Sequence, residues 1–227
     1  MTFLQVCQRL GQEAAIGNMG NPSDVVSQVG EEKRIVDWVA TVYEDVQNLH
    51  LDWNFLRTSF SFAMTSGTGA YPTTSVTNYA SWDQDGPDTF RTYLTASGIS
   101  DEQVIQYVAW EDYRTAYLLA SQRTTTGRPT IYTIKPDESL LLWPIPDDDY
   151  TLVGEYFILP DIMAVSGDIP IIPPRFHMVL VWGGLMFYGA YSAEPDKYAF
   201  GEDRYEKILR KLEIDQLPQL SFGESLA

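Results

Sequence analysis

Residues 127–160 read GRPTIYTIKPDESLLLWPIPDDDYTLVGEYFILP, and residues 173–191 read PPRFHMVLVWGGLMFYGAY. The first stretch alternates short apolar runs with turn residues, a pattern typical of β-strands. The second is a long apolar run that begins with two prolines, a pattern typical of a buried helix. Helical patterns also occur near the N-terminus, before the β region. This order predicts a helical domain that is split by a β-rich insertion.

The strands of the first stretch are separated by KPDE and PIPDDD, in which Pro and Asp stand where turns favour them. The short connections predict that the last three strands form an antiparallel meander. Upstream, aromatic residues alternate with Ser and Thr after Arg57, which is typical of a half-buried strand. The sequence thus predicts a short helix at residues 111–119 and strands at residues 57–64, 89–94, 103–108, 130–134, 139–143 and 150–159.

Four longer helices are expected outside the β region. Thr2 and Gln5 form a capping-box pattern at the start of the first, which Gly17 and Gly20 would end. Glu31 suits the positive N-terminal end of the second helix. Prolines at 170, 173 and 174 set up the third. The second, third and fourth helices are expected at residues 31–50, 175–192 and 198–212.

These elements predict an α+β fold, a helical bundle formed by the N- and C-terminal helices with an inserted antiparallel β-rich domain. Residues 1–56 and 169–216 are expected to form the two parts of the bundle. Residues 57–168 are expected to form the insertion. Residues 217–227 are expected to be an extended C-terminal tail.

The chain is acidic, since its 227 residues include 31 acidic and 15 basic side chains and its formal net charge is −16. Each region of the chain has an excess of acidic residues, so no basic stripe is available to neutralise the phosphates of a bound nucleic acid. This charge is ordinary for a soluble protein. It also suits a surface past which DNA slides without sticking.

The N-terminus lacks the basic segment of a signal peptide, and one apolar stretch, residues 176–193, approaches the length of a membrane span. That stretch contains His177 and three glycines, so a buried helix of a soluble bundle is the better interpretation. Cys7 is the single cysteine and lies on the apolar face of the first helix, which predicts a core residue. We expect synthesis in a reducing cytoplasm and no membrane partner.

The sequence offers no catalytic, cofactor-binding or metal-binding residues, and we expect a protein that is not an enzyme. The two histidines, His50 and His177, cannot form a histidine-rich metal site, and nucleotide-binding glycine loops and serine-nucleophile motifs are absent. His177 begins an apolar helix, where a core role is expected. The run at residues 147–149 reads as an acidic hairpin turn rather than a calcium ligand set. Asp83, Asp85 and Asp88 resemble half a calcium loop but lack its later glutamate.

The order of elements resembles that of the head-to-tail adaptor proteins of tailed bacteriophages. The stretch at residues 127–160, followed by the proline-started helix, is similar to the pattern of that family. There a G-x-P opens a strand, an L-x-L-x-P-x-P hairpin and a strand with Y-x-x-x-Y follow, and a histidine stands in the first turn of the next helix. The present chain departs from the tyrosine spacing, with Tyr150 and Tyr156. The resemblance covers essentially the whole chain, but its motifs are structural.

The resemblance implies a ring, usually of twelve copies, located at the head–tail junction of the virion and made in the host bacterial cytoplasm. The ring would dock beneath the portal protein, receive a tail or nozzle protein, and extend the channel through which double-stranded DNA passes without sequence-specific binding. In such families the C-terminal segment often lies against the portal. In this chain the implied partner-binding residues are Leu217, Leu220, Phe222 and Leu226.

Two other functions stay open at the level of sequence. The insertion could be a carbohydrate-binding, tail-associated module in which exposed Trp82, Trp110 or Trp143 stacks on sugars. The chain could also be a tail-associated glycan-degrading enzyme with a pair of carboxylates. No particular pair of its 31 acidic residues stands out, so the enzyme is the least favoured interpretation.

Overall fold

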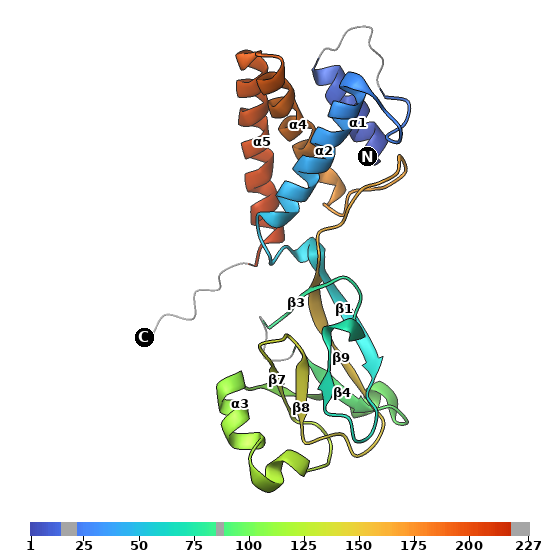
Figure 1. Ribbon diagram of the computed structural model, residues 1–227, viewed down its shortest axis with the longest axis vertical. Helices are drawn as coiled ribbons and strands as arrows, with labels where there is room; N and C mark the ends of the chain where they lie inside the picture. The colour runs from blue at the N-terminus through green and yellow to red at the C-terminus, as the bar shows by residue number, and fades with distance from the viewer. Residues whose placement is uncertain (15–21, 85–88, 219–227) are drawn as a thin grey trace, which may run out of the picture. The chain divides into compact units, whose positions relative to one another are not determined.

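A computed structural model of the chain describes residues 1–14, 22–84 and 89–218. The chain forms two compact units, one of residues Met1–Leu56 with Pro160–Ala227 and one of residues Arg57–Leu159. We call these the helical unit and the insertion. The fold is α+β, with helices from both ends of the chain and an inserted β-rich region that is mostly antiparallel, as the sequence predicts (Figure 1).

The helical unit is organised around α4, which contacts the three other helices of the unit. These helices are α1 (Phe3–Glu13), α2 (Gly30–Asn48), α4 (Met178–Tyr191) and α5 (Pro195–Gln216). The predicted capping box is confirmed, because the Thr2 hydroxyl accepts from the Gln5 backbone N–H and the Gln5 side chain accepts from the Thr2 N–H. A proline stands in the first turn of α5, which begins three residues earlier than expected.

Two glycines allow the neighbouring helices to approach α4 closely. A Cβ atom at Gly183 would lie 2.5 Å from a Val42 methyl carbon of α2, and one at Gly184 would lie 2.5 Å from a Leu10 methyl carbon of α1. Both distances are shorter than carbon atoms can approach, so any larger residue at these positions would force the Val42 or Leu10 side chain to shift. The apolar run that resembles a membrane span is therefore built for packing against helices.

The described residues of the insertion form two β-sheets and one short helix, α3 (Trp110–Tyr117). The strands of the first sheet are β1 (Arg57–Ala63), β9 (Tyr150–Ile158), β4 (Arg91–Leu94) and β5 (Gln103–Val104), with β3 (Tyr79–Trp82) paired to β9. The strands of the second sheet are β2 (Ala70–Tyr71), β8 (Leu140–Trp143), β7 (Ile131–Ile134) and β6 (Gln106–Tyr107). Short 3₁₀ turns lie at Asn54–Leu56, Thr73–Ser75, Gly98–Asp101, Ala120–Thr124 and Pro174–Phe176.

The predicted meander of the last three strands is wrong for the third of them. β7 and β8 form an antiparallel hairpin, but β9 lies in the other sheet and pairs with β1 from Arg57↔Phe157 to Ala63↔Thr151. Pro144 and Pro146 follow β8 and have no N–H to continue its ladder, so the chain leaves the second sheet there. The short segment between β8 and β9, which the sequence predicts to be a hairpin turn, instead carries the chain from the second sheet to the first.

The strand expected at residues 103–108 is also divided between the sheets. β5 pairs antiparallel with β4, whereas β6 pairs parallel with β7, and the buried side chain of Ile105 separates them. The strands β2 and β3 were not predicted. They bring Tyr71, Tyr79 and Trp82 against the core of the insertion.

Residues 160–168 group with the helical unit, whereas the sequence assigned them to the insertion. Polar contacts hold this segment to the helices. The Gln47 side chain donates to the Asp161 carbonyl and accepts from the Asp161 N–H, and the Phe3 N–H donates to the Asp168 carbonyl. The insertion as a compact unit therefore ends at Leu159 rather than at residue 168.

Candidate interaction surfaces

His177 lies in the core of the helical unit, as predicted. Its side chain is fully buried, its Nε2 donates to the Ile172 carbonyl at 2.8 Å, and its Nδ1 accepts from the Met1 amino group at 2.8 Å. Burial lowers the pKa of the ring, because the charged form is poorly solvated there. Both ring nitrogens have protein partners, so this histidine positions the start of α4.

The other residues that suggested site chemistry also have structural contacts. His50 follows α2, where its Nε2 lies 3.3 Å from a Glu213 carboxylate oxygen and its ring meets that of Trp53 edge to face. Cys7 is buried, and burial raises the pKa of its thiol to about 12. Such a thiol is protonated at neutral pH and a weak nucleophile.

Two carboxylates of the acidic turn at residues 147–149 accept hydrogen bonds from neighbouring residues of the turn. Asp147 accepts from the Tyr150 hydroxyl at 2.9 Å, and Asp148 accepts from the Asp149 N–H at 2.8 Å. Asp83 forms an ion pair with Arg57. Within residues 1–14, 22–84 and 89–218, no group of three His, Cys, Asp or Glu side chains is placed to hold a metal ion. Asp85 and Asp88 lie outside the described residues.

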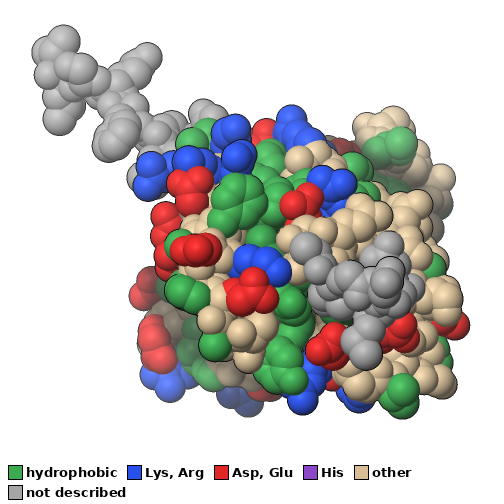
Figure 2. Space-filling model, turned by 90° about the horizontal axis from the view of Figure 1, so that it is seen from above, with side chains coloured by type: hydrophobic (Ala, Val, Ile, Leu, Met, Phe, Trp, Pro, Cys, Tyr) green, Lys and Arg blue, Asp and Glu red, His purple; other side chains and the backbone are tan. Residues whose placement is uncertain are grey.

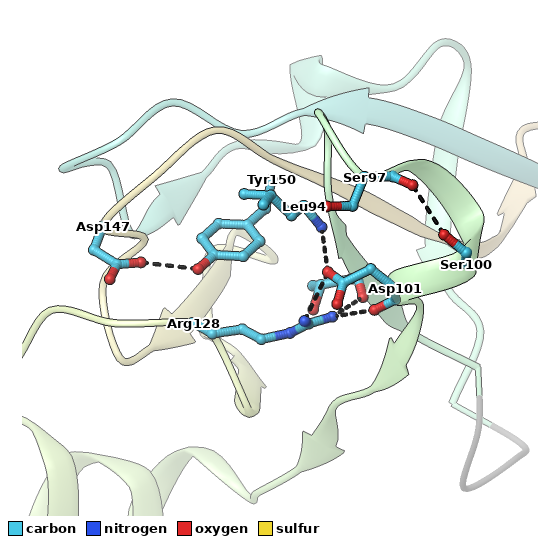
Figure 3. A network of polar contacts seen from close by, with 8 residues as sticks. Leu94, Ser97, Ser100, Asp101, Arg128, Asp147 and Tyr150 are labelled. Atoms are coloured by element: carbon cyan, nitrogen blue, oxygen red, sulfur yellow. Dashed lines mark hydrogen bonds and ion pairs between the residues drawn. The ribbon is translucent and has the colours of Figure 1, made fainter.

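A polar network in the insertion is centred on Arg128 (Figure 3). Its Nη1 donates to a carboxylate oxygen of Asp101 at 2.8 Å, and its Nη2 donates to the backbone carbonyls of Thr92 and Asp101. The N–H of Leu94 donates to the same carboxylate, and this bond, followed by the guanidinium, lowers the pKa of Asp101. The network ties the segment before β7 to β4 and to the turn at Gly98–Asp101, which is a structural role.

Stacking on a sugar requires an exposed tryptophan ring, and the three tryptophans considered for that function are buried or half-buried. Trp82 is 4% exposed and its Nε1 donates to the Glu138 carbonyl, so the expectation that it is exposed is wrong. Trp110 and Trp143 are half-buried. Trp143 packs on Tyr117, and its Nε1 donates to the Gln122 carbonyl. The rings of Trp82 and Trp143 thus pack within the insertion.

The predicted portal-binding residues lie at the end of the chain. Leu217 is the C-cap residue of α5, is half-buried, and donates its N–H to the Glu213 carbonyl at 3.0 Å. Leu220, Phe222 and Leu226 lie outside the described residues. Their role stays a prediction.

An apolar groove, which the sequence analysis missed, runs along α4 between α2 and α5. Its volume is about 340 Å³, and Phe187 in its lining is 40% exposed. The groove is lined by Val42, Asp45, Gly183, Met186, Phe187, Ala190, Tyr198 and Tyr205. An all-apolar helix pattern predicts burial but does not show which side the neighbouring helices leave uncovered.

The outer side of α5 is also uncovered. Of the 22 described residues of this helix, the buried ones are Gly201 and Leu212, whereas Phe200 is 46% and Ile214 is 68% exposed. In the face of the molecule shown in Figure 2, hydrophobic side chains reach the surface among interspersed acidic and basic side chains. The side chains of Phe200 and Ile214 leave apolar area of α5 open to solvent.

Within the described parts of the chain, no helix is both long enough and apolar enough to cross a lipid bilayer. The family model described as "SU10 adaptor protein" matches residues 1–221 of the chain. No curated protein matches it.

Proposed function

The chain belongs to the SU10 adaptor protein family, and we propose that it forms a ring beneath the portal that joins the phage head to the tail. The family is one of structural phage adaptors rather than enzymes. The observation that carries the proposal is the match of the family model to residues 1–221, which include both units of the fold. The ring would extend the DNA channel and provide the attachment site for the tail.

The composition and the surface of the helical unit support this function. A net charge of −16 makes the protein a poor binder of DNA phosphates, which suits the wall of a channel through which double-stranded DNA passes. The uncovered side of α5 and the groove along α4 offer apolar area to neighbouring copies. A closed ring uses a head-to-tail contact that repeats from copy to copy.

The portal protein and a tail or nozzle protein are the proposed partners. The test is negative-stain imaging of the purified protein with and without a ring of portal protein. We expect rings of the chain stacked on the portal ring. If the chain binds neither the portal nor any tail component, the adaptor function is wrong.

The C-terminal segment is the proposed portal anchor, through Leu217, Leu220, Phe222 and Leu226. Deletion of residues 219–227 leaves the described end of α5 intact and removes three of the four side chains. We expect the deleted chain to fold like the full chain, as judged by circular dichroism, and to lose attachment to the portal. Unchanged attachment would assign the contact to another surface.

A further inference from the structure

The two flanks of α5 differ in chemistry. Tyr198 and Tyr205 line the apolar groove on one flank. Phe200 and Lys207 each follow one of these tyrosines by two positions, which turns their side chains by about 200° around the helix axis. They therefore project from the opposite flank, where Phe200 meets the Trp182 ring edge to face.

The flank of Phe200 is a basic ridge, which we define as Phe200, Arg204, Lys207, Lys211 and Ile214. Their spacing of four, three, four and three residues places them along one side of the helix. All five side chains are exposed. Residues 203–211 contain four basic and two acidic side chains, and one of the acidic ones, Asp203, forms an ion pair with Lys207. The expectation from the sequence that the chain has no basic stripe is therefore wrong for this side of α5.

The groove on the other flank has an acidic rim. Asp45 of α2 lines it, and Glu202 stands between the two tyrosines on α5 and is exposed. Burial, and then the nearby carboxylates of Asp45 and Glu213, raise the pKa of Tyr205. Among the described residues that line the groove, none is a lysine or an arginine.

We propose that the basic ridge of one copy docks on the acid-rimmed groove of a second copy. This inference rests on the proposed function and identifies the surfaces through which neighbouring copies associate. Ridge and groove lie on different sides of the same chain, so the contact is head-to-tail and leaves one ridge and one groove free at each step. Such a contact repeats from copy to copy and forms a ring where the rotation between copies closes.

The volume of the groove limits what it can receive. A helix is about 10 Å wide with its side chains, so a groove of 340 Å³ receives side chains from a ridge rather than a whole helix. The methylene stems of Lys207 and Lys211 would cover Met186 and Phe187. Their ammonium groups would reach the rim, where Lys207 would exchange its ion pair with Asp203 of its own helix for one with the second copy. Charge complementarity fixes the partner and the orientation, while the apolar contact provides most of the affinity.

The test compares two charge-reversed variants by sedimentation velocity at a series of concentrations. The ridge variant carries Lys207→Glu and Lys211→Glu, and the rim variant carries Asp45→Lys and Glu202→Lys. In each variant alone, like charges face each other, and we expect the apparent dissociation constant to rise by about tenfold or more. An equimolar mixture pairs each altered surface with an opposite charge, and we expect it to recover assembly.

The matched control carries Lys33→Glu and Arg114→Glu, which change the net charge by the same amount as the ridge variant. Lys33 lies on α2, nine residues before Val42 and thus on the other side of that helix, and Arg114 lies in the insertion. We expect this variant to assemble like the unaltered chain. Added salt should weaken assembly of the unaltered chain, because it screens the pairing of exposed charges.

The outcomes separate this inference from the proposed function. If the ridge and rim variants assemble like the unaltered chain, or the mixture does not recover, the ridge-to-groove contact is wrong even where rings form. If the unaltered chain stays monomeric at its highest soluble concentration yet binds the portal, the inference is wrong and the adaptor function stands. If it neither assembles nor binds the portal, both are wrong.

Discussion

At the scale of single residues, His177 shows how a residue type associated with catalysis serves packing. Its ring is fully buried and both nitrogens are occupied by backbone groups. Protonation of this buried ring would lower the free energy of unfolding. Its titration therefore couples the stability of the helical unit to pH.

The pH dependence of stability tests this coupling. Below about pH 6.5, the ordinary pKa of histidine, the unfolded chain binds a proton that the buried His177 ring does not bind. The free energy of unfolding should therefore fall as the pH falls from 8 to 5.5, a range above that in which most carboxylates titrate. His177→Gln should be less stable at pH 8 but should lose less stability across this range.

Thermal or urea unfolding at several pH values measures the effect. Val179→Ala is the matched control, because Val179 is buried in the same helix and has no titratable group. It should lower the free energy of unfolding and retain the slope of the unaltered chain. Parallel curves for His177→Gln and the unaltered chain would show that another group causes the decline.

At the scale of elements, the helices could be predicted and the sheet assignments could not. The cap of α1 depends on Thr2 and Gln5, three residues apart, and the apolar run of α4 has a helical length, so local sequence was sufficient. The partners of β9 are β1, β3 and β4, which lie more than fifty residues before it. The sequence around β9 does not show that this strand pairs with β1, β3 and β4 rather than with β8, the strand before it in the chain.

The candidate surfaces show the same limit. The turn residues Asp147 to Asp149 and the core position of His177 followed from local pattern. The groove did not, because it depends on where α2 and α5 leave α4 uncovered. Trp82 was wrongly expected to be exposed, since the strand that buries it, β3, has a mixed polar and apolar sequence.

The Arg128 network is expected to hold elements of the insertion together. Arg128→Met removes the donors to the two backbone carbonyls and to the Asp101 carboxylate. Loss of the bonds to the carbonyls alone should destabilise the insertion by about 2 kcal/mol. Arg128→Lys should recover part of this, because an ammonium cannot reproduce the fork of a guanidinium.

Urea unfolding of these variants, followed by tryptophan fluorescence, measures the difference. Arg114→Met is the control, since Arg114 pairs with Glu111 on an exposed surface of α3. It should change the free energy of unfolding by less than about 0.5 kcal/mol. An equally small effect of Arg128→Met would mean that water replaces the network without loss.

At the scale of the whole molecule, the chain passes between the two units at two points that are adjacent in one sheet. The first is at Leu56 and Arg57, and the second is at Leu159 and Pro160. Arg57 is paired with Phe157, and paired residues of antiparallel strands lie about 5 Å apart. The helical unit thus needs only a short connection in place of the insertion.

A chain in which a short Gly-Ser linker replaces residues 57–159 should therefore fold. Its core contacts join α4 to α1, α2 and α5, all of which remain. We expect a helical circular dichroism spectrum and a single cooperative unfolding transition. A chain of this kind that unfolds without cooperativity would show that the helical unit depends on the insertion.

The pairing at this seam also has a mechanical consequence. A force that pulls Leu56 away from Pro160 acts first on the pair Arg57 and Phe157. It therefore tends to separate β1 from β9 one residue pair at a time, starting at this end of the sheet. Phe157 is paired on its other side with Ser81 of β3. β9 is therefore anchored from both sides where such a load enters, and this end of the sheet is reinforced against peeling.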